Sequence, residues 1–137
     1  MNELAQGYWE KALDSLKAAK YVLPASSDAA ASRAYYAALY AVSAFFAERG
    51  VTFTKHTAAQ AAVHRDLVKT GRWPEELGEG YSFLLKLRGT GDYSALVRVT
   101  PDKAQKAVET AARIVEAVAR TNPPEFTQPP GTRVGKP

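Results

Sequence analysis

Residues 26–50, SSDAAASRAYYAALYAVSAFFAERG, decide the fold that we predict for this chain. Apolar side chains recur there every three or four residues, which is the spacing of an α-helix, with Tyr35 and Val42 on one side. A second apolar row, through Tyr40, lies roughly opposite. A helix that is apolar almost all round is covered on several faces, so we expect a central helix that ends at Gly50.

The helical period continues on both sides of this segment. Residues 2–23 form one amphipathic pattern that stops before Pro24, and residues 54–71 form a shorter one. Residues 74–88 form another, after which RGTGDY interrupts the period with two glycines and predicts a turn. A last pattern covers residues 101–118. The sequence therefore predicts an all-α, up-and-down helical bundle of four long helices plus a shorter helix.

The composition is that of one globular domain: 137 residues, 46% hydrophobic and 23% charged. The absence of cysteine excludes disulfides, thiol chemistry and zinc fingers. We see no signal peptide and no run of about 18 apolar residues, so we expect a cytoplasmic protein with no membrane span. We expect residues 1–121 to form the bundle, and the proline-rich residues 122–137 to be a disordered tail that folding does not need.

The net charge of +4 is divided between two segments of the chain. Residues 55–98 and residues 120–137 each carry a net charge of +2, and the rest is balanced. A mild positive bias in the middle of the chain is compatible with a partner that bears phosphate groups, although it does not require one.

The two histidines, His56 and His64, are eight residues apart on one predicted helix. No cysteine or nearby pair of carboxylates accompanies them, so they make a poor metal site. We interpret both as ordinary surface or partly buried histidines. The sequence also has no phosphate-loop or dinucleotide-binding glycine pattern, and we predict neither a metal nor a cofactor.

Two groups of residues are candidates for a functional site. The first is Arg33 with Tyr36 and Tyr40 on the central helix, where an arginine among apolar residues needs a carboxylate, a carbonyl or a ligand phosphate. A structural arginine that pairs with an acid of a neighbouring helix is the alternative interpretation.

The second group is Arg88, Asp92 and Tyr93. Arg88 leaves the helix on its apolar face, and Asp92 is the nearest acid across the predicted two-glycine turn. We expect these three residues to form one polar site that faces a cleft, with Arg33 or Tyr36 nearby. If the helix continues, Arg88 and Asp92 are instead an ordinary ion pair one turn apart, with a tyrosine anchor.

The strings SRAYYAALYAVSAFFAERG, TKHT, LVKTG and LLKLRGTGDYS, in this order and spacing, resemble those of a HEPN domain. The resemblance runs from about residue 3 to residue 119 and is closest to the small stand-alone prokaryotic HEPN proteins. It implies a helical bundle that forms a homodimer, with a cleft near the dimer interface. Many HEPN proteins are RNases, or toxins whose antitoxin is a minimal nucleotidyltransferase; others bind nucleotides or serve as partner modules.

The RNase motif of the HEPN family is an arginine followed, after four to six residues, by a histidine. Arg88 matches the arginine, but Tyr93 stands where the histidine is expected, and no histidine follows Arg88. Histidine is the best acid or base near neutral pH, whereas tyrosine, with an ordinary pKa of about 10, is a poor base. This departure argues against RNase activity, although Arg88 still offers charge stabilisation at a phosphate.

We therefore take Arg88, which matches the family's arginine, with Asp92 and Tyr93 as candidate catalytic residues, and Arg33, Tyr36 and Tyr40 as candidate ligand-binding residues. The function that we expect is a HEPN protein that binds nucleotide or RNA and acts with a minimal nucleotidyltransferase partner, as a toxin or a degenerate relative of one. Two alternatives stay open, an active metal-independent RNase and a non-catalytic helical interaction module. Whether the protein is an enzyme is therefore undecided by the sequence.

Overall fold

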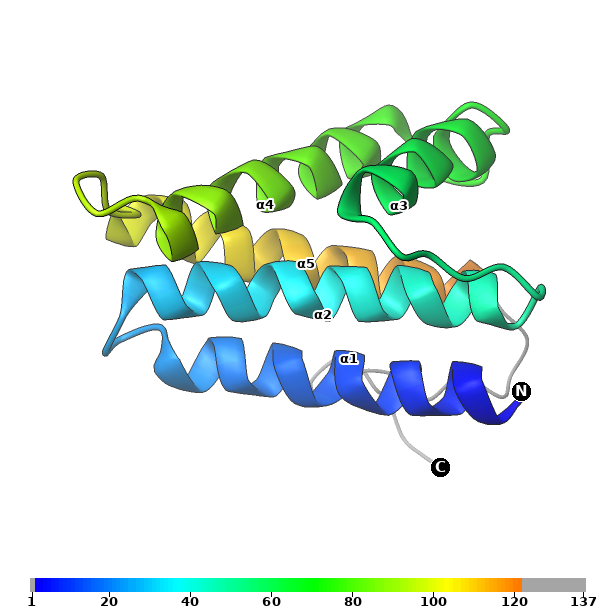
Figure 1. Cartoon of the computed structure of the whole chain (residues 1–137), viewed down its shortest axis with the longest axis horizontal. Helices are drawn as coiled ribbons and strands as arrows, with labels where there is room; N and C mark the ends of the chain where they lie inside the picture. Colours follow the sequence, from blue (N-terminus) through cyan, green and yellow to red (C-terminus); the bar gives the residue numbers. More distant parts are fainter. Residues whose placement is uncertain (1, 122–137) are drawn as a thin grey trace.

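Helices make up most of residues 2–121, the part of the chain that this computed structural model describes (Figure 1). These residues contain no β-strand, and the predicted all-α bundle is confirmed. The tail that we predict at residues 122–137 lies outside the described residues. In chain order the elements are α1 (Glu3–Val22), α2 (Ser27–Ala47), α3 (His56–Ala62), the π-helix η1 (Val63–Val68), α4 (Glu75–Tyr93) and α5 (Pro101–Thr121).

The central helix is α2, which packs against α1, α4 and α5 (Figure 1). The chain reverses direction from α1 to α2, again to α4 and again to α5, so that α2 and α5 run the same way. These two helices still share an extensive contact. Short side chains let helix axes approach closely, and α2 buries eight alanines, namely Ala30, Ala31, Ala34, Ala37, Ala38, Ala41, Ala44 and Ala47.

Local signals account for the ends of several helices. The side chain of Asn2 accepts the backbone N–H of Ala5 at 2.8 Å, which satisfies an unpaired donor at the start of α1. Ser26 does the same for Ala29 at the start of α2. Gly50, three residues after the last residue of α2, has a φ of 78°, a conformation that glycine adopts without strain. None of the helices in residues 2–121 is long and apolar enough to cross a membrane.

The segment 88–93 differs from our prediction of a glycine turn. α4 continues through Gly89 and Gly91 to Tyr93, and neither glycine has a positive φ. Gly91 lies against the start of α2, where a Cβ atom would be 3.2 Å from the backbone oxygen of Asp28. The glycine permits a close approach of two helices rather than a turn, and the chain therefore stays helical.

The segment 54–71 also differs from the single helix that we expected. α3 begins at His56 and changes into the π-helix η1, in which the N–H of Lys69 donates to the carbonyl oxygen of His64 five residues earlier. α4 packs tightly on this segment, since a Cβ atom on Gly78 would lie 2.7 Å from Cγ2 of Val68. No local sequence signal distinguishes this π-helix from an ordinary helical turn.

Candidate functional site

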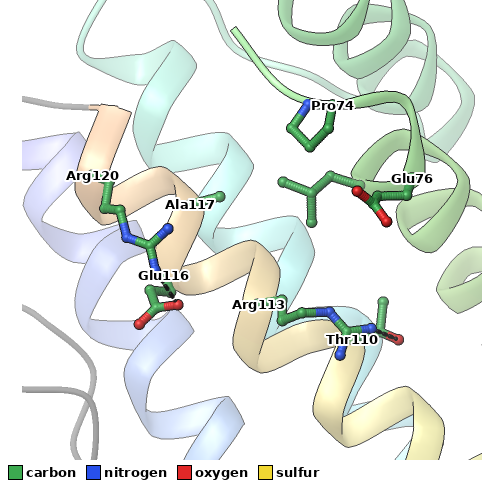
Figure 2. A pocket seen from close by; sticks show the side chains of 8 residues that line it. Pro74, Glu76, Thr110, Arg113, Glu116, Ala117 and Arg120 are labelled. Atoms are coloured by element: carbon green, nitrogen blue, oxygen red, sulfur yellow. Dashed lines mark hydrogen bonds and ion pairs between the residues drawn. The ribbon is translucent and has the colours of Figure 1, made fainter.

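A groove of about 400 Å³ lies between the start of α4 and the second half of α5 (Figure 2). Both arginines of the groove have partners within it. Arg120 pairs with Glu116, and Arg113 donates to the hydroxyl of Thr110 at 3.4 Å. None of the candidate residues from the sequence lines it. The groove combines charges of both signs, which makes it a weaker candidate for an anionic ligand than the region around Arg88.

Arg88 is the only charged residue that is buried in the described part of the chain. Its Nη1 donates a hydrogen bond to the hydroxyl of Tyr93 at 2.9 Å. Its Nε is buried and has no hydrogen-bond partner among residues 2–121. A buried donor without a partner is costly, and each such group in a native protein needs an explanation, such as an ordered water, an ion or a functional role.

Aromatic rings surround the guanidinium of Arg88. Its central carbon lies 5.3 Å from the ring centre of Tyr35, 5.1 Å from that of Tyr93 and 6.0 Å from that of Tyr36. The faces of these rings attract a cation, by about 0.5–2 kcal/mol for each favourable contact. The charge of Arg88 is thus held in place largely by rings, which do not neutralise it.

Asp92 does not compensate this charge fully. Its Oδ2 lies 3.8 Å from Nη1 of Arg88, beyond hydrogen-bond distance, and accepts instead from the hydroxyl of Ser32 at 3.4 Å. The structure therefore places Arg88 and Asp92 on one face of a continuous helix, as in the alternative that we considered. Asp92 connects α4 with α2 through its contact with Ser32. It compensates the positive charge of Arg88 only in part.

The row of Arg33, Tyr36 and Tyr40 on α2 adjoins Arg88. The guanidinium of Arg33 lies 5.0 Å from the ring centre of Tyr36, and the ring centres of Tyr36 and Tyr40 are 5.8 Å apart. Arg33 is half-buried and forms no ion pair with any residue of the described chain, so no acid of residues 2–121 takes the partner role that we considered for it. The predicted catalytic and ligand-binding groups thus meet at Tyr36. We call Arg33, Tyr36, Arg88, Asp92 and Tyr93 the Arg88 cluster.

A small cavity of about 160 Å³ begins where this row ends. The rings of Tyr8 and Tyr40 stack there with centres 6.3 Å apart, and the ammonium group of Lys11 lies 5.4 Å from the centre of the Tyr40 ring. We call this space the Tyr40 cavity; the residues that line it are Tyr8, Leu39, Tyr40, Ser43, Phe53, Thr54, Lys55 and His56.

His56 is the residue at this site that the sequence analysis set aside. Its Nδ1 lies 2.6 Å from the hydroxyl of Tyr35, and its ring lies edge-on to the rings of Tyr35 and Tyr36, with centres 5.4 Å and 6.3 Å apart. Burial lowers the pKa of His56, and the nearby charge of Arg88 lowers it further. Burial also raises the pKa of Tyr35 to about 12, so its hydroxyl keeps its proton at neutral pH.

The other histidine has a structural position. Nε2 of His64 lies 2.9 Å from the hydroxyl of Ser82, which joins the π-helix η1 to α4. This matches our interpretation of His64 as an ordinary, partly buried histidine. No group of three histidine or carboxylate side chains in residues 2–121 is arranged to hold a metal ion.

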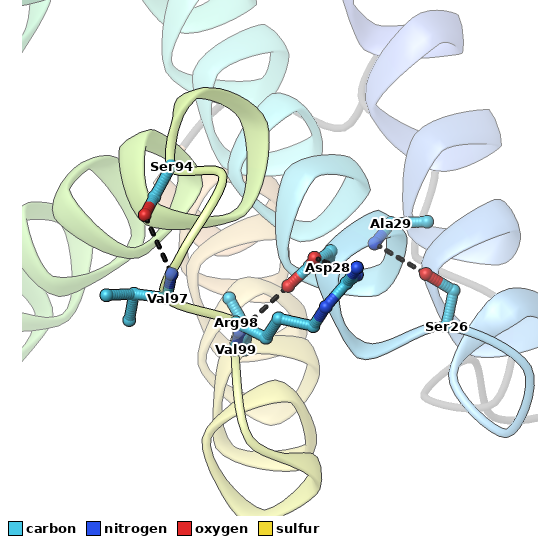
Figure 3. Close-up of polar contacts among 7 residues, drawn as sticks. All are labelled: Ser26, Asp28, Ala29, Ser94, Val97, Arg98 and Val99. Atoms are coloured by element: carbon cyan, nitrogen blue, oxygen red, sulfur yellow. Dashed lines mark hydrogen bonds and ion pairs between the residues drawn. The ribbon is translucent and has the colours of Figure 1, made fainter.

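The loop that follows Tyr93 is fixed to the start of α2 (Figure 3). The carboxylate of Asp28 accepts the backbone N–H of Val99 at 2.8 Å and lies 3.5 Å from the guanidinium of Arg98. Leu96 remains 95% exposed and Val97 58% exposed. The loop thus presents apolar side chains to solvent next to the exposed ring of Tyr93.

The sequence profile of the HEPN domain matches residues 5–121 of this chain. The chain belongs to the HEPN family. A Thermotoga maritima protein named UPF0332 protein is 35% identical over 115 residues, which cover 82% of this chain and 87% of that protein. A Methanocaldococcus jannaschii protein, whose name describes it as a candidate toxin, is 29% identical over 97 residues, 70% of this chain and 66% of that protein.

The fold of this HEPN protein is also found in a crystal structure. TT1696 from Thermus thermophilus superposes with a TM-score of 0.74, at 23% sequence identity, over 89% of this chain and all of that one. At this level of identity the likeness concerns the fold alone. The family assignment itself rests on the profile match and on the Thermotoga maritima relative.

Proposed function

We propose that this HEPN protein binds RNA or a nucleotide, and that a phosphate group of the ligand contacts Arg88. The observation that carries the proposal is the buried guanidinium of Arg88, whose Nε has no partner in the described chain and whose nearest carboxylate is 3.8 Å away. Arginine has a planar fork of donors that fits a phosphate. Attraction between the two is stronger beside a buried apolar face than in water.

The neighbours of Arg88 suit the other parts of such a ligand. Arg33 adds a second positive charge within reach of the Tyr36 ring. Tyr36, Tyr93 and Tyr40 supply faces on which nucleobases can stack, with about 1–3 kcal/mol for each stacked base. This combination of cations and aromatic rings is typical of surfaces that bind single-stranded nucleic acid.

We also propose a toxin-like role with a minimal nucleotidyltransferase partner and a homodimeric assembly. The relative named as a candidate toxin supports the first. The exposed Leu96 and Val97, beside Tyr93, supply apolar surface for the second. A light-scattering mass of a dimer at micromolar concentration is the expected result, and a monomer mass would contradict the dimer. Co-purification of a nucleotidyltransferase encoded by a neighbouring gene tests the partner.

The binding proposal is tested with a fluorescently labelled single-stranded RNA and with ATP, by fluorescence anisotropy. Arg88→Met should weaken binding at least tenfold, which corresponds to about 1.4 kcal/mol. The control is Arg65→Met, because Arg65 is an exposed arginine outside the cluster that pairs with the neighbouring Asp66. This variant should change the affinity less than about twofold.

Two results would argue against the proposal. If Arg88→Met bound RNA and ATP as tightly as the wild type, the ligand site would lie elsewhere. If the wild-type protein bound neither, the remaining function would be that of a non-catalytic interaction module, and both Arg88 and Arg33 would have structural roles.

A further inference from the structure

Three lysines of α4 and α5 extend the positive charge of the protein beyond the Arg88 cluster. Lys86 of α4 and Lys103 and Lys106 of α5 are exposed, and we call them the lysine row. We propose that the lysine row binds the phosphate backbone of a single-stranded RNA, another phosphate of which contacts Arg88. This inference rests on the proposed binding of RNA at the Arg88 cluster, and it adds a second binding site for the same strand.

A pocket of about 200 Å³ lies between α4 and α5 at the lysine row. The residues that line it are Phe83, Lys86, Leu87, Thr90 and Lys103. Pockets that hold small molecules usually measure about 300–1,000 Å³, so this one suits a single phosphate group better than a whole nucleotide. Two lysines and the hydroxyl-bearing Thr90 supply groups that bind the oxygens of a phosphate.

Phe83 holds the third lysine at the same pocket. The ammonium group of Lys106 lies 4.8 Å from the centre of the Phe83 ring. The face of an aromatic ring attracts a cation without neutralising it. Because Phe83 itself lines the pocket, Lys106 belongs to the same group of positive charges as Lys86 and Lys103.

The charges of the lysine row are not compensated by carboxylates. None of the three lysines forms an ion pair in the described part of the chain. Glu109, three residues after Lys106, accepts instead from the side-chain amide of Gln105 at 2.9 Å. Asp102 lies in the first turn of α5, where the helix N-terminus attracts a carboxylate. Like charges that share one pocket repel one another, so an anion between them is favoured.

Helix α4 connects the lysine row with the Arg88 cluster. Lys86 and Tyr93 are seven residues apart on this continuous helix, so they point within about 20° of the same direction and lie about 10 Å apart along its axis. The hydroxyl of Tyr93 accepts from Arg88, and its ring is 75% exposed. A strand that contacts Arg88 and stacks a base on Tyr93 therefore reaches Lys86 within a few nucleotides.

Single-stranded RNA is the ligand that suits both parts of this surface. Proteins that bind single strands combine positive charges along the backbone with aromatic rings for the bases, and here the lysine row and Tyr93 supply the two. Lysine is a point charge on a flexible stem, which suits a backbone of variable geometry. The paired bases of a duplex are not free to stack on Tyr93, so a duplex fits this arrangement less well.

The test uses the full chain, a labelled single-stranded RNA of about 12 nucleotides and ATP, with fluorescence anisotropy at several salt concentrations. The triple variant Lys86→Gln, Lys103→Gln and Lys106→Gln should reduce the slope of log affinity for RNA against log salt by about 2, since each contact with a single strand contributes about 0.7. Its affinity for ATP, which reaches only the Arg88 cluster, should change less than about twofold.

The matched control is the triple variant Lys17→Gln, Lys20→Gln and Lys69→Gln. It removes the same charge from exposed positions on α1 and after η1, and should change the slope by less than about 0.5. If the lysine-row variant had the same slope as this control, the lysine row would not contact RNA, while binding that depends on Arg88 would still support the proposed function.

Two measurements on the wild type keep the inference open to refutation if the variant does not fold. The salt slope should be steeper by about 2 for the longer RNA than for one of about 3 nucleotides, and equal slopes would overturn the second site. Poly-uridine should displace the labelled RNA, and poly-glutamate should do so at least about tenfold less well. Equal competition would mean that the lysine row binds any polyanion, and a wild type that binds no RNA would overturn the proposed function as well.

Discussion

Arg88 and Asp92 lie one helical turn apart on α4, yet their nearest charged atoms remain 3.8 Å apart. Asp92 accepts instead from Ser32 of α2. The guanidinium is therefore a buried charge that is only partly compensated in the protein. Buried charges without full compensation reduce stability, and they are retained mainly where function needs them.

Replacement of Arg88 by methionine should leave the stability of the protein nearly unchanged or improve it. Methionine has a similar length and removes a charge that costs free energy to bury, so we expect a free energy of unfolding within about 1 kcal/mol of the wild type, or above it. Urea denaturation measures this. A loss of about 3–5 kcal/mol would mean that Arg88 belongs to a structural ion pair.

Substitution by alanine should have opposite effects on stability at two glycines of α4. A Cβ atom on Gly89 meets nothing within 4 Å, so Gly89→Ala should stabilise the helix by about 0.5–1 kcal/mol. A Cβ atom on Gly78 would lie 2.7 Å from Cγ2 of Val68, so Gly78→Ala should cost about 1–3 kcal/mol. Thermal unfolding of both variants measures the difference. If Gly89→Ala is less stable than the wild type, the result would support the glycine turn that we first predicted at residues 88–93.

The stability of the protein should depend on pH through His56. Because the pKa of His56 is lowered in the native state, the unfolded chain binds more protons between the ordinary pKa of about 6.5 and the lower native value. Stability therefore falls as the pH is lowered through this window. The free-energy difference between the wild type and His56→Gln, measured by urea denaturation, should shift in favour of the variant from about pH 7 to about pH 5. A difference that does not change with pH would show that the native pKa is not lowered.

The carboxylate of Asp28 should be important for the loop after α4. It accepts the N–H of Val99, a buried residue, so Asp28→Ala should cost about 1–3 kcal/mol and expose that amide to hydrogen exchange. Ser94→Ala serves as the control, because Ser94 accepts an N–H in the exposed part of the loop and should change stability by less than about 0.5 kcal/mol. Unchanged exchange of the Val99 amide in Asp28→Ala would mean that other contacts hold the loop.

Periodicity within single segments was enough to predict the bundle. The apolar rows of residues 26–50 are visible along the sequence, and they require a helix that is covered on several sides. The prediction of a glycine turn was wrong because Gly91 packs against the backbone of Asp28, which is distant in the sequence. Local patterns record which residues share a face, and they contain no information about which helix will meet that face.

The candidate site, like the fold, was predictable only where its residues are close together in the sequence. Arg88, Asp92 and Tyr93 are one short motif, and Tyr36 was expected nearby. His56 was missed because its contact with Tyr35 depends on how α3 docks on α2. A buried tyrosine on the central helix was the available signal, since its hydroxyl needs a partner, but the sequence does not name that partner.

The π-helix η1 sets the rotation of α3 about its axis, and it therefore determines whether His56 faces Tyr35. Each residue of an α-helix turns the chain by about 100°, so a deletion of one residue within Val63–Val68 would rotate the start of α3 relative to the end that packs on Gly78. His56 would then point away from Tyr35 although the histidine itself had not changed. Relatives of this protein therefore need to be compared by the length of this segment as well as by the residue in the aligned column, because one inserted or deleted residue can separate two proteins that share every side chain of the site.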